Sequence, residues 1–163
     1  MKGMNLCISA IVILIYIPVL FAQPPDTLWT KTYAGFYQDV GWSVQQTHDG
    51  GYIISGWTFS FGIGTPNYSN ILLIKTDKNG GTQWLKTYGG NYNDIGYQVK
   101  QTTDMGYIIT GFTDSFSGGT IELYLIKTDS LGDTLWTKVY RSENGADGYS
   151  IQQTADGGYI VTG

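Results

Sequence analysis

The sequence predicts an all-β protein built from a repeated unit of four short antiparallel strands. Glycine supplies 23 of the 163 residues and aromatic residues 15%, whereas charged residues make up only 13%. Trp29, Trp84 and Trp136 recur 55 and 52 residues apart in similar settings. No stretch beyond residue 25 keeps a helical spacing of apolar residues. This composition excludes a coiled coil and a charged disordered tail.

The first 22 residues are predicted to be a secretory signal peptide. Lys2 gives the positive start, residues 6–20 are apolar apart from Ser9, and Ala22 ends a cleavage site before Gln23. An uncleaved membrane anchor is the alternative, but the run is short for a span of about 20 residues. Residues 23–25 are a linker. We expect a secreted, periplasmic or cell-surface protein that has no membrane association after cleavage.

Three repeats follow the linker, at residues 26–80, 81–132 and 133–163. Eighteen residues after each tryptophan comes a threonine: Thr47, Thr102 and Thr154. A short motif then repeats as Asp-Gly-Gly-Tyr-Ile-Ile, Asp-Met-Gly-Tyr-Ile-Ile and Asp-Gly-Gly-Tyr-Ile-Val, and each block closes on a glycine. Self-similarity at a fixed period of this length is typical of repeat architectures.

Each repeat contains four strand-like runs, which in the first repeat are 28–33, 41–47, 52–58 and 71–76. All are rich in β-branched and aromatic residues and are bounded by Gly, Asp or Asn. The Asp-Gly-Gly turns supply residues that tolerate positive φ, so two strands can reverse tightly. Met105 replaces the first of these glycines in the second repeat, which predicts a strained or differently shaped turn.

Four antiparallel strands in about 50 residues match the size of one β-propeller blade. The repeated tryptophan follows the junction between units, where its ring can pack between neighbours. The fold expected is therefore an incomplete β-propeller of repeated four-stranded blades.

The motif Leu-Ile-Lys-Thr-Asp…Gly…Trp, followed by Gln-Gln-Thr-x-Asp-Gly-Gly-Tyr-Ile-Val-x-Gly, carries a resemblance over residues 26–163. It resembles the β-propeller repeats of secreted bacterial proteins, which often carry a C-terminal type IX secretion sorting domain. It is also distantly similar to quinoprotein-type blades. The resemblance implies an exported repeat protein and says almost nothing about activity.

The third repeat reaches only the glycine that closes the third strand-like run of the first two repeats. Two complete repeats and a partial third cannot close a ring of about 4–8 blades. We therefore expect a fragment of a longer protein, whose remaining blades are its partners, and poor folding when it is expressed alone. A self-assembling short chain and an open solenoid are the alternatives.

In a four-stranded meander successive turns alternate between two ends, so the first and third loops of each repeat are expected to share one face. These loops vary between repeats, and variable loops on a rigid scaffold commonly bind ligands. They carry aromatic rings together with Asn and Asp, which suits an extracellular glycan or protein. The alternative is that the rings pack beneath their own loops. The candidate binding residues are Phe36, Tyr37, Asp39, Phe61, Tyr68, Tyr92, Asp94 and Phe116.

Other chemistry finds little support in the sequence. The net charge of −4, without any basic block, argues against nucleic acid. One Cys and one His exclude a Cys/His zinc site and a disulfide framework. Asp39 and Asp94 are possible calcium ligands, but an aspartate that bonds its own backbone in a turn is the better interpretation. His48 is expected in an exposed turn.

The sequence therefore predicts a non-catalytic exported binding segment with no metal, no cofactor and no catalytic residues. The alternative function is part of an exported propeller enzyme, a glycosidase or a quinoprotein-like oxidoreductase, whose catalytic residues lie outside this chain.

Overall fold

The computed structural model describes residues 28–116 and 118–163, and these form an all-β structure of ten strands. The predicted signal peptide (1–22) and linker (23–25) lie outside the described residues. None of the described residues forms a helix with the length and hydropathy that a membrane span needs. The strands are β1 (Asp39–Gln46), β2 (Tyr52–Thr58), β3 (Asn70–Thr76), β4 (Thr82–Tyr88), β5 (Asp94–Gln101), β6 (Tyr107–Thr113), β7 (Glu122–Thr128), β8 (Thr134–Tyr140), β9 (Ser150–Gln153) and β10 (Tyr159–Thr162).

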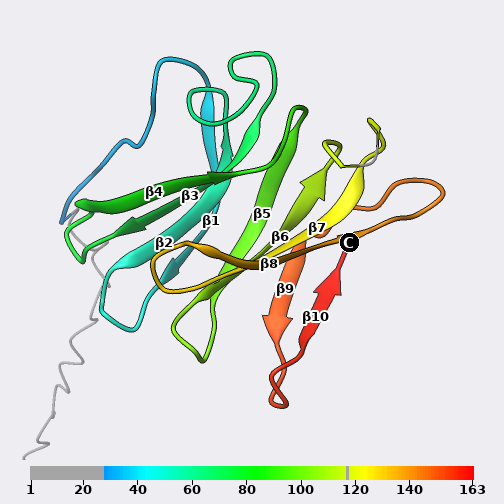
Figure 1. The fold of residues 1–163 in the computed structure, drawn as a ribbon. Coiled ribbons are helices and arrows are strands. Elements are labelled where there is room, and N and C mark those ends of the chain that lie inside the picture. The colour runs from blue at the N-terminus through cyan, green and yellow to red at the C-terminus, as the bar shows by residue number, and fades with distance from the viewer. Residues whose placement is uncertain (1–27, 117) are drawn as a thin grey trace, which may run out of the picture.

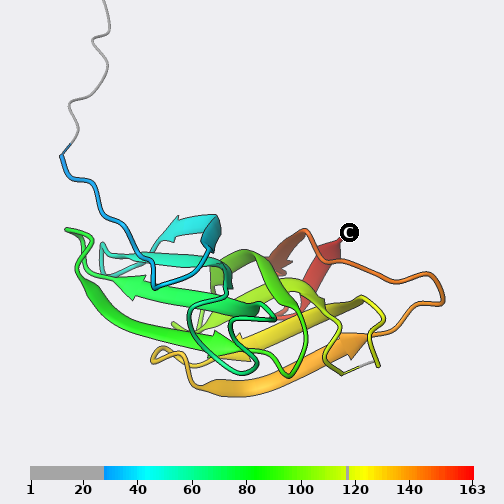
Figure 2. The ribbon, with the colours of Figure 1, turned by 90° about the horizontal axis from the view of Figure 1, so that it is seen from above.

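The strands form three antiparallel sheets with the order of the chain, β1-β2-β3-β4, β5-β6-β7-β8 and β9-β10. This arrangement confirms the predicted all-β architecture of blade-like repeats. The sheets lie next to one another, and β5 contacts both β1 and β9 (Figure 1). Seen from above, β1, β5 and β9 lie along one side and β4 and β8 along the other (Figure 2). We call these the inner and outer edges.

The sheets are offset by one strand from the sequence repeats. The strand that carries Trp84 is the last strand of the first sheet, although it opens the second repeat. The predicted strand at 28–33 is wrong, because these residues have no strand partner and take no strand conformation. They nevertheless lie where β4 and β8 lie relative to the sheets that follow them. Tyr33 donates to the Gly80 carbonyl at 2.8 Å, as Tyr88 donates to Gly132 at 2.7 Å.

The core lies between neighbouring sheets. Ile71 and Leu73 of β3 pack with Val99, Tyr107 and Ile109 of the second sheet, all at most 1% exposed. Burying each such side chain stabilises the fold by roughly 1.5–3 kcal/mol.

The repeated tryptophans pack between units, as predicted. Trp84 meets Tyr107 edge-on with 5.8 Å between ring centroids. Trp136 meets Tyr159 at 5.9 Å, and Trp29 meets Tyr52 at 5.7 Å.

A β-bulge on the inner strand explains the glycine that closes each repeated block. The pairing of β1 with β2 shifts between Gly41 and Ser43, so Trp42 is an extra residue. A Cβ atom on Gly56, which lies opposite, would stand 1.8 Å from the Val40 carbonyl oxygen. Only glycine fits there, and the second sheet repeats the same geometry at Gly111 and Ile95.

The Asp-Gly-Gly turns hold a buried lysine whose role the sequence did not reveal. Lys75 is only 4% exposed, and its ammonium donates to Asp49 and to the Thr76 carbonyl, both at 2.8 Å. Hydrogen bonds from Lys75 and Thr47 lower the pKa of Asp49 to about 2. Lys127, Asp104 and Thr128 repeat this arrangement in the second sheet.

Met105 adopts the predicted strained conformation, with φ of 68°. The turn keeps the shape of the first one, because the Met105 amide donates to Thr102 at 2.9 Å as Gly50 donates to Thr47. A non-glycine residue in the left-handed region costs roughly 1–2 kcal/mol.

Candidate functional site

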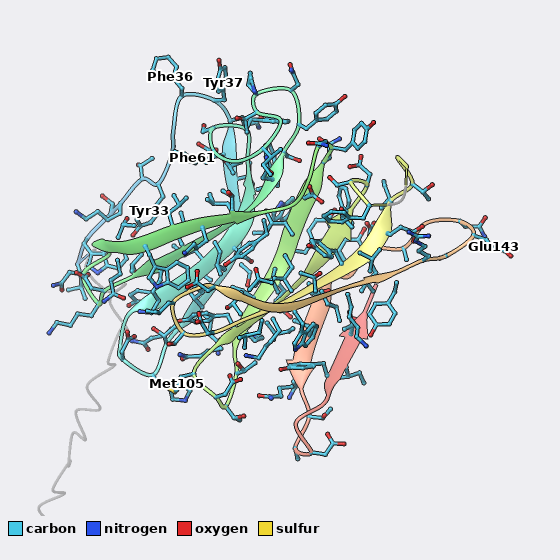
Figure 3. The ribbon with its side chains drawn as sticks, viewed as in Figure 1. Tyr33, Phe36, Tyr37, Phe61, Met105 and Glu143 are labelled. Carbon is cyan, nitrogen blue, oxygen red and sulfur yellow. The ribbon has the colours of Figure 1, made fainter. Side chains whose placement is uncertain are left out.

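The variable loops gather at one end of the sheets, as the sequence predicted. The Tyr37 amide donates to the Ser60 hydroxyl at 2.9 Å, and the Tyr92 amide donates to the Ser115 hydroxyl at 3.0 Å. Each bond joins the loop that precedes a sheet to the loop between its second and third strands. Phe36, Tyr37 and Phe61 lie at this end, whereas Met105 lies at the opposite end (Figure 3). We call the first end the loop face.

Asp39 and Asp94 tie the loops together. Asp39 Oδ2 accepts from the Gly35 amide at 2.7 Å and from the Ser60 hydroxyl at 2.8 Å. Asp94 Oδ2 accepts from the Gly90 amide at 2.9 Å and from the Ser115 hydroxyl at 2.8 Å. Each carboxylate thus bonds the backbone four residues earlier, which is the turn role expected from the sequence.

The two carboxylates differ in ionisation because they differ in burial. Burial raises the pKa of Asp39, but hydrogen bonds from Thr58, Gly35 and Ser60 outweigh it and leave the pKa below its ordinary value. Asp94 is fully buried, and desolvation raises its pKa despite hydrogen bonds from the loop groups around it. Asp94 therefore acts inside the loop face and presents no accessible oxygen.

The predicted aromatic residues form separate pairs. Tyr68 and Tyr92 come from the two sides of the sheet junction and meet edge-on at 5.2 Å. Phe36, which is 98% exposed, lies 6.4 Å from Tyr37. Phe116 packs against another ring of its own sheet, Tyr124, at 5.6 Å.

Phe61 lies against the preceding loop. A Cβ atom on Gly35 would stand 2.9 Å from the Phe61 ring and closer still to Ser60. The structure thus joins Tyr68 to Tyr92 and Phe36 to Tyr37, and it does not gather all the predicted rings into one site.

A cavity of about 220 Å³ opens between the two four-stranded sheets at the loop face. Three of its eight lining residues are aromatic, and Trp57 meets Phe59 edge-on at 5.1 Å. We call it the inter-sheet cavity. Its lining residues are Trp57, Phe59, Ser69, Asn93, Ile95, Phe112, Asp114 and Ile121.

Asn93 connects the polar groups of this cavity. Its side-chain oxygen lies 3.3 Å from both the amide and the hydroxyl of Ser69, which donate to it. Its side-chain nitrogen donates to Asp114 Oδ2 at 3.3 Å. One amide therefore bridges the first sheet to the second, and amide, hydroxyl and carboxylate groups stand beside aromatic rings. Mostly apolar walls with a few placed polar groups are typical of small-molecule sites.

None of the eight predicted binding residues lines the inter-sheet cavity. Trp57 and Phe112 occupy the same position of β2 and β6, so the sequence presents them as ordinary strand residues. The signal that could have found them is a large aromatic ring repeated beside a variable loop. The cavity itself exists only where two sheets meet, which no single repeat shows.

Other polar clusters have structural partners. Exposed His48 lies at the turn expected for it, where its Nδ1 is 2.7 Å from Gln101 Oε1. The half-buried Lys86 pairs with Asp133 at 2.8 Å. Within residues 28–116 and 118–163, no three His, Cys, Asp or Glu residues are grouped as metal ligands.

By its fold and this site, the protein is an all-β chain of repeated blade-like sheets with an aromatic cavity at the loop face. Comparisons with known protein families and with curated proteins found no match.

Proposed function

We propose that this protein is a non-catalytic exported binding module that recognises an extracellular glycan at its loop face. The observation that carries the proposal is the inter-sheet cavity, where the Trp57, Phe59 and Phe112 rings stand beside Asn93 and Asp114. A sugar ring has an apolar face of C–H groups and an edge of hydroxyl groups. Aromatic rings suit the face, while amide and carboxylate groups suit the edge.

Hydrogen bonds within the protein fix the polar groups of the cavity in place. Asn93 is fixed by Ser69 on one side and Asp114 on the other. Its side-chain amide has two N–H groups, so one remains for a ligand after the bond to Asp114. A volume of about 220 Å³ accommodates one sugar ring, with the rest of a chain lying across the exposed loops. Fixed polar groups reduce the entropy that is lost on binding.

The proposal also covers the export of this protein and its relationship to a wider family. We infer that residues 1–22 direct secretion, and that the chain is a segment of a β-propeller similar to those of secreted bacterial proteins. Repeated four-stranded antiparallel sheets that pack in chain order support this relationship.

Glycan binding by the purified full chain tests the proposal, first on a glycan array and then by calorimetry with the best ligand. Trp57→Ala should weaken binding roughly tenfold or more, because central aromatic rings dominate most interfaces. Trp42→Ala is the matched control, since Trp42 is another strand tryptophan, 57% exposed, that lies outside the inter-sheet cavity. It should leave affinity unchanged.

Three results would contradict the proposal. The first is that no glycan binds although the chain is folded by circular dichroism. The second is binding that survives Trp57→Ala. The third is release of sugar products from the bound glycan, which would favour the enzyme alternative.

A further inference from the structure

The third sheet has a free edge beside an apolar groove. Among the described strands, β10 pairs only with β9, on one side. Next to it lies a hollow of about 670 Å³, which we call the β10 groove. Its lining residues are Leu123, Leu125, Trp136, Lys138, Tyr140, Tyr159 and Val161. An edge strand of this kind presents unpaired N–H and C=O groups.

The second sheet shows what fills the equivalent place. There, β7 pairs with β6 along seven residue pairs, from Tyr107↔Thr128 to Thr113↔Glu122. Its Tyr124 and Ile126 side chains pack into the core against Leu73 and the Trp84 ring of the first sheet. Leu73 and Trp84 correspond by repeat to Leu125 and Trp136, which line the β10 groove. A third strand with large apolar side chains at alternate positions therefore matches the groove.

Asp156 supplies the second, independent observation. Asp49 and Asp104 each accept an ammonium group from the third strand of their sheet at 2.8 Å. Asp49 and Asp104 also accept hydrogen bonds from a threonine and a glycine of their own turns. Asp156 keeps these turn bonds, since it accepts from the Thr154 hydroxyl at 2.5 Å and from the Gly158 amide at 3.2 Å. No lysine of the described residues pairs with it. Within the part of the chain that the structure describes, Asp156 thus has the turn bonds of Asp49 and Asp104 without the lysine that those two carboxylates bind.

Gly158 points to the same occupant. A Cβ atom on Gly51 would stand 2.1 Å from the Thr76 carbonyl oxygen, and Gly106 has the same relation to Thr128. These glycines make room for the end of the third strand. At Gly158 the nearest atoms belong to its own turn, at 3.0 Å or more. The space for a strand end is present there.

We propose that the β10 groove is a docking site for one antiparallel strand of the β3 and β7 type, supplied by a further repeat of this kind. Large apolar side chains at alternate positions fill the groove, and a Lys-Thr pair follows them. The lysine ammonium binds Asp156, and the threonine carbonyl lies over Gly158. The backbone bonds to β10 give affinity, and the lysine fixes the register.

A synthetic peptide with the sequence of residues 120–129 is the probe, added to the full chain. We expect saturable binding of one peptide per chain and slower hydrogen exchange at the free edge of β10. A peptide carrying Lys127→Gln should bind about three- to tenfold more weakly. The Asp156→Asn chain should lose the same factor and no longer distinguish the two peptides, because the pair is then already broken.

Val161→Lys should abolish binding, since it places a charge in the groove. Ile54→Lys is the matched control, because Ile54 lies at the equivalent position of β2 on another groove of the molecule. Asp156→Asn keeps the test decisive if Val161→Lys disturbs the small sheet. Absence of binding, or binding that Val161→Lys and Asp156→Asn leave unchanged, would overturn the proposal. So would sedimentation showing that a second copy of the chain fills the groove.

Discussion

Strands β1 and β5 carry equivalent positions of one repeat, yet their environments differ. Val44 pairs with Ile54 and Val99 with Ile109 in the same register. Val44 is 65% exposed and Val99 is 0% exposed. The difference comes from the neighbours, because β5 lies between β1 and β9, whereas among the described residues β1 has a neighbouring sheet on one side only.

The local sequence therefore determines where a strand forms and how it pairs, while the burial of its side chains depends on the next repeat. A single sheet of this kind cannot bury both of its faces, and in repeat proteins stability is shared between each unit and its interfaces. The same residue type should therefore contribute differently in the two sheets.

The largest expected difference lies between Ile109 and Ile54. Ile109→Ala should lower the free energy of unfolding by about 3 kcal/mol, because it leaves a cavity in the core between sheets. Ile54→Ala should cost less than about 1 kcal/mol, because Ile54 faces an open groove. Urea unfolding of both variants measures the two losses of free energy. Equal losses would show that burial between sheets does not determine what an isoleucine at this position contributes to stability.

A smaller effect concerns the lysine–aspartate pairs. Hydrogen bonds from Lys127 and Thr102 lower the pKa of Asp104 from its ordinary 3.8 to about 2. A carboxyl with a lowered folded-state pKa stabilises the fold above pH 3.8, and this stability is lost as the pH falls through 2. Asp104→Asn should reduce the stability that is lost on acidification by about 1 kcal/mol or less, since the carboxylate is 56% exposed.

Asp156→Asn is the control for this prediction, because Asp156 has no lysine among the described residues. It should change the acid response less than Asp104→Asn does. Melting temperatures between pH 2 and pH 6 provide the measurement. A larger effect of Asp156→Asn would mean that the hydroxyl and amide bonds, rather than the lysine, hold these turns.

The smallest effect is expected at Met105. Met105→Gly should stabilise the chain by roughly 0.5–1 kcal/mol. Glycine removes the strain of the left-handed conformation, and part of this gain is offset because glycine raises the conformational entropy of the unfolded chain. Gly50→Ala, at the same position of the first sheet with φ of 80°, should destabilise by a similar amount. Thermal unfolding of both variants tests whether the two turns share one conformation, and an unchanged melting temperature in both would show that they do not.

Much of the fold could be predicted from the repeat. The predicted strand at 52–58 has the bounds of β2, and 71–76 differs from β3 by one residue. The grouping of strands into sheets could not be predicted in the same way, because a pattern of four strands that repeats along the chain does not show which strand begins a sheet. One physical signal was available. The Asp-x-x-Gly junction is as short as a hairpin turn, so it joins strands within a sheet, whereas residues 89–93 cross between sheets.

The candidate site was less accessible to sequence reasoning. The aromatic residues chosen from the variable loops lie at the loop face, but the inter-sheet cavity uses Trp57 and Phe112 from strands. Asp94 could be assigned as a turn residue, yet its burial depends on two loops closing over it. Both features arise from contacts between units, which a pattern within one unit does not encode.

The inner edge is joined by side chains rather than by a backbone ladder. Gln45 accepts from the Gln101 amide at 2.8 Å, and Gln101 in turn accepts from the His48 amide at 2.9 Å. Gln98 and Gln153 make similar bonds between the second and third sheets. Because each unit carries its own adjustable linking groups, duplication of one unit in the gene inserts a complete module without re-pairing any existing strand. Such a chain can change length during evolution by whole units, while the bond that the His48 and Thr103 amides donate to Gln101 and Gln153 recurs at both junctions.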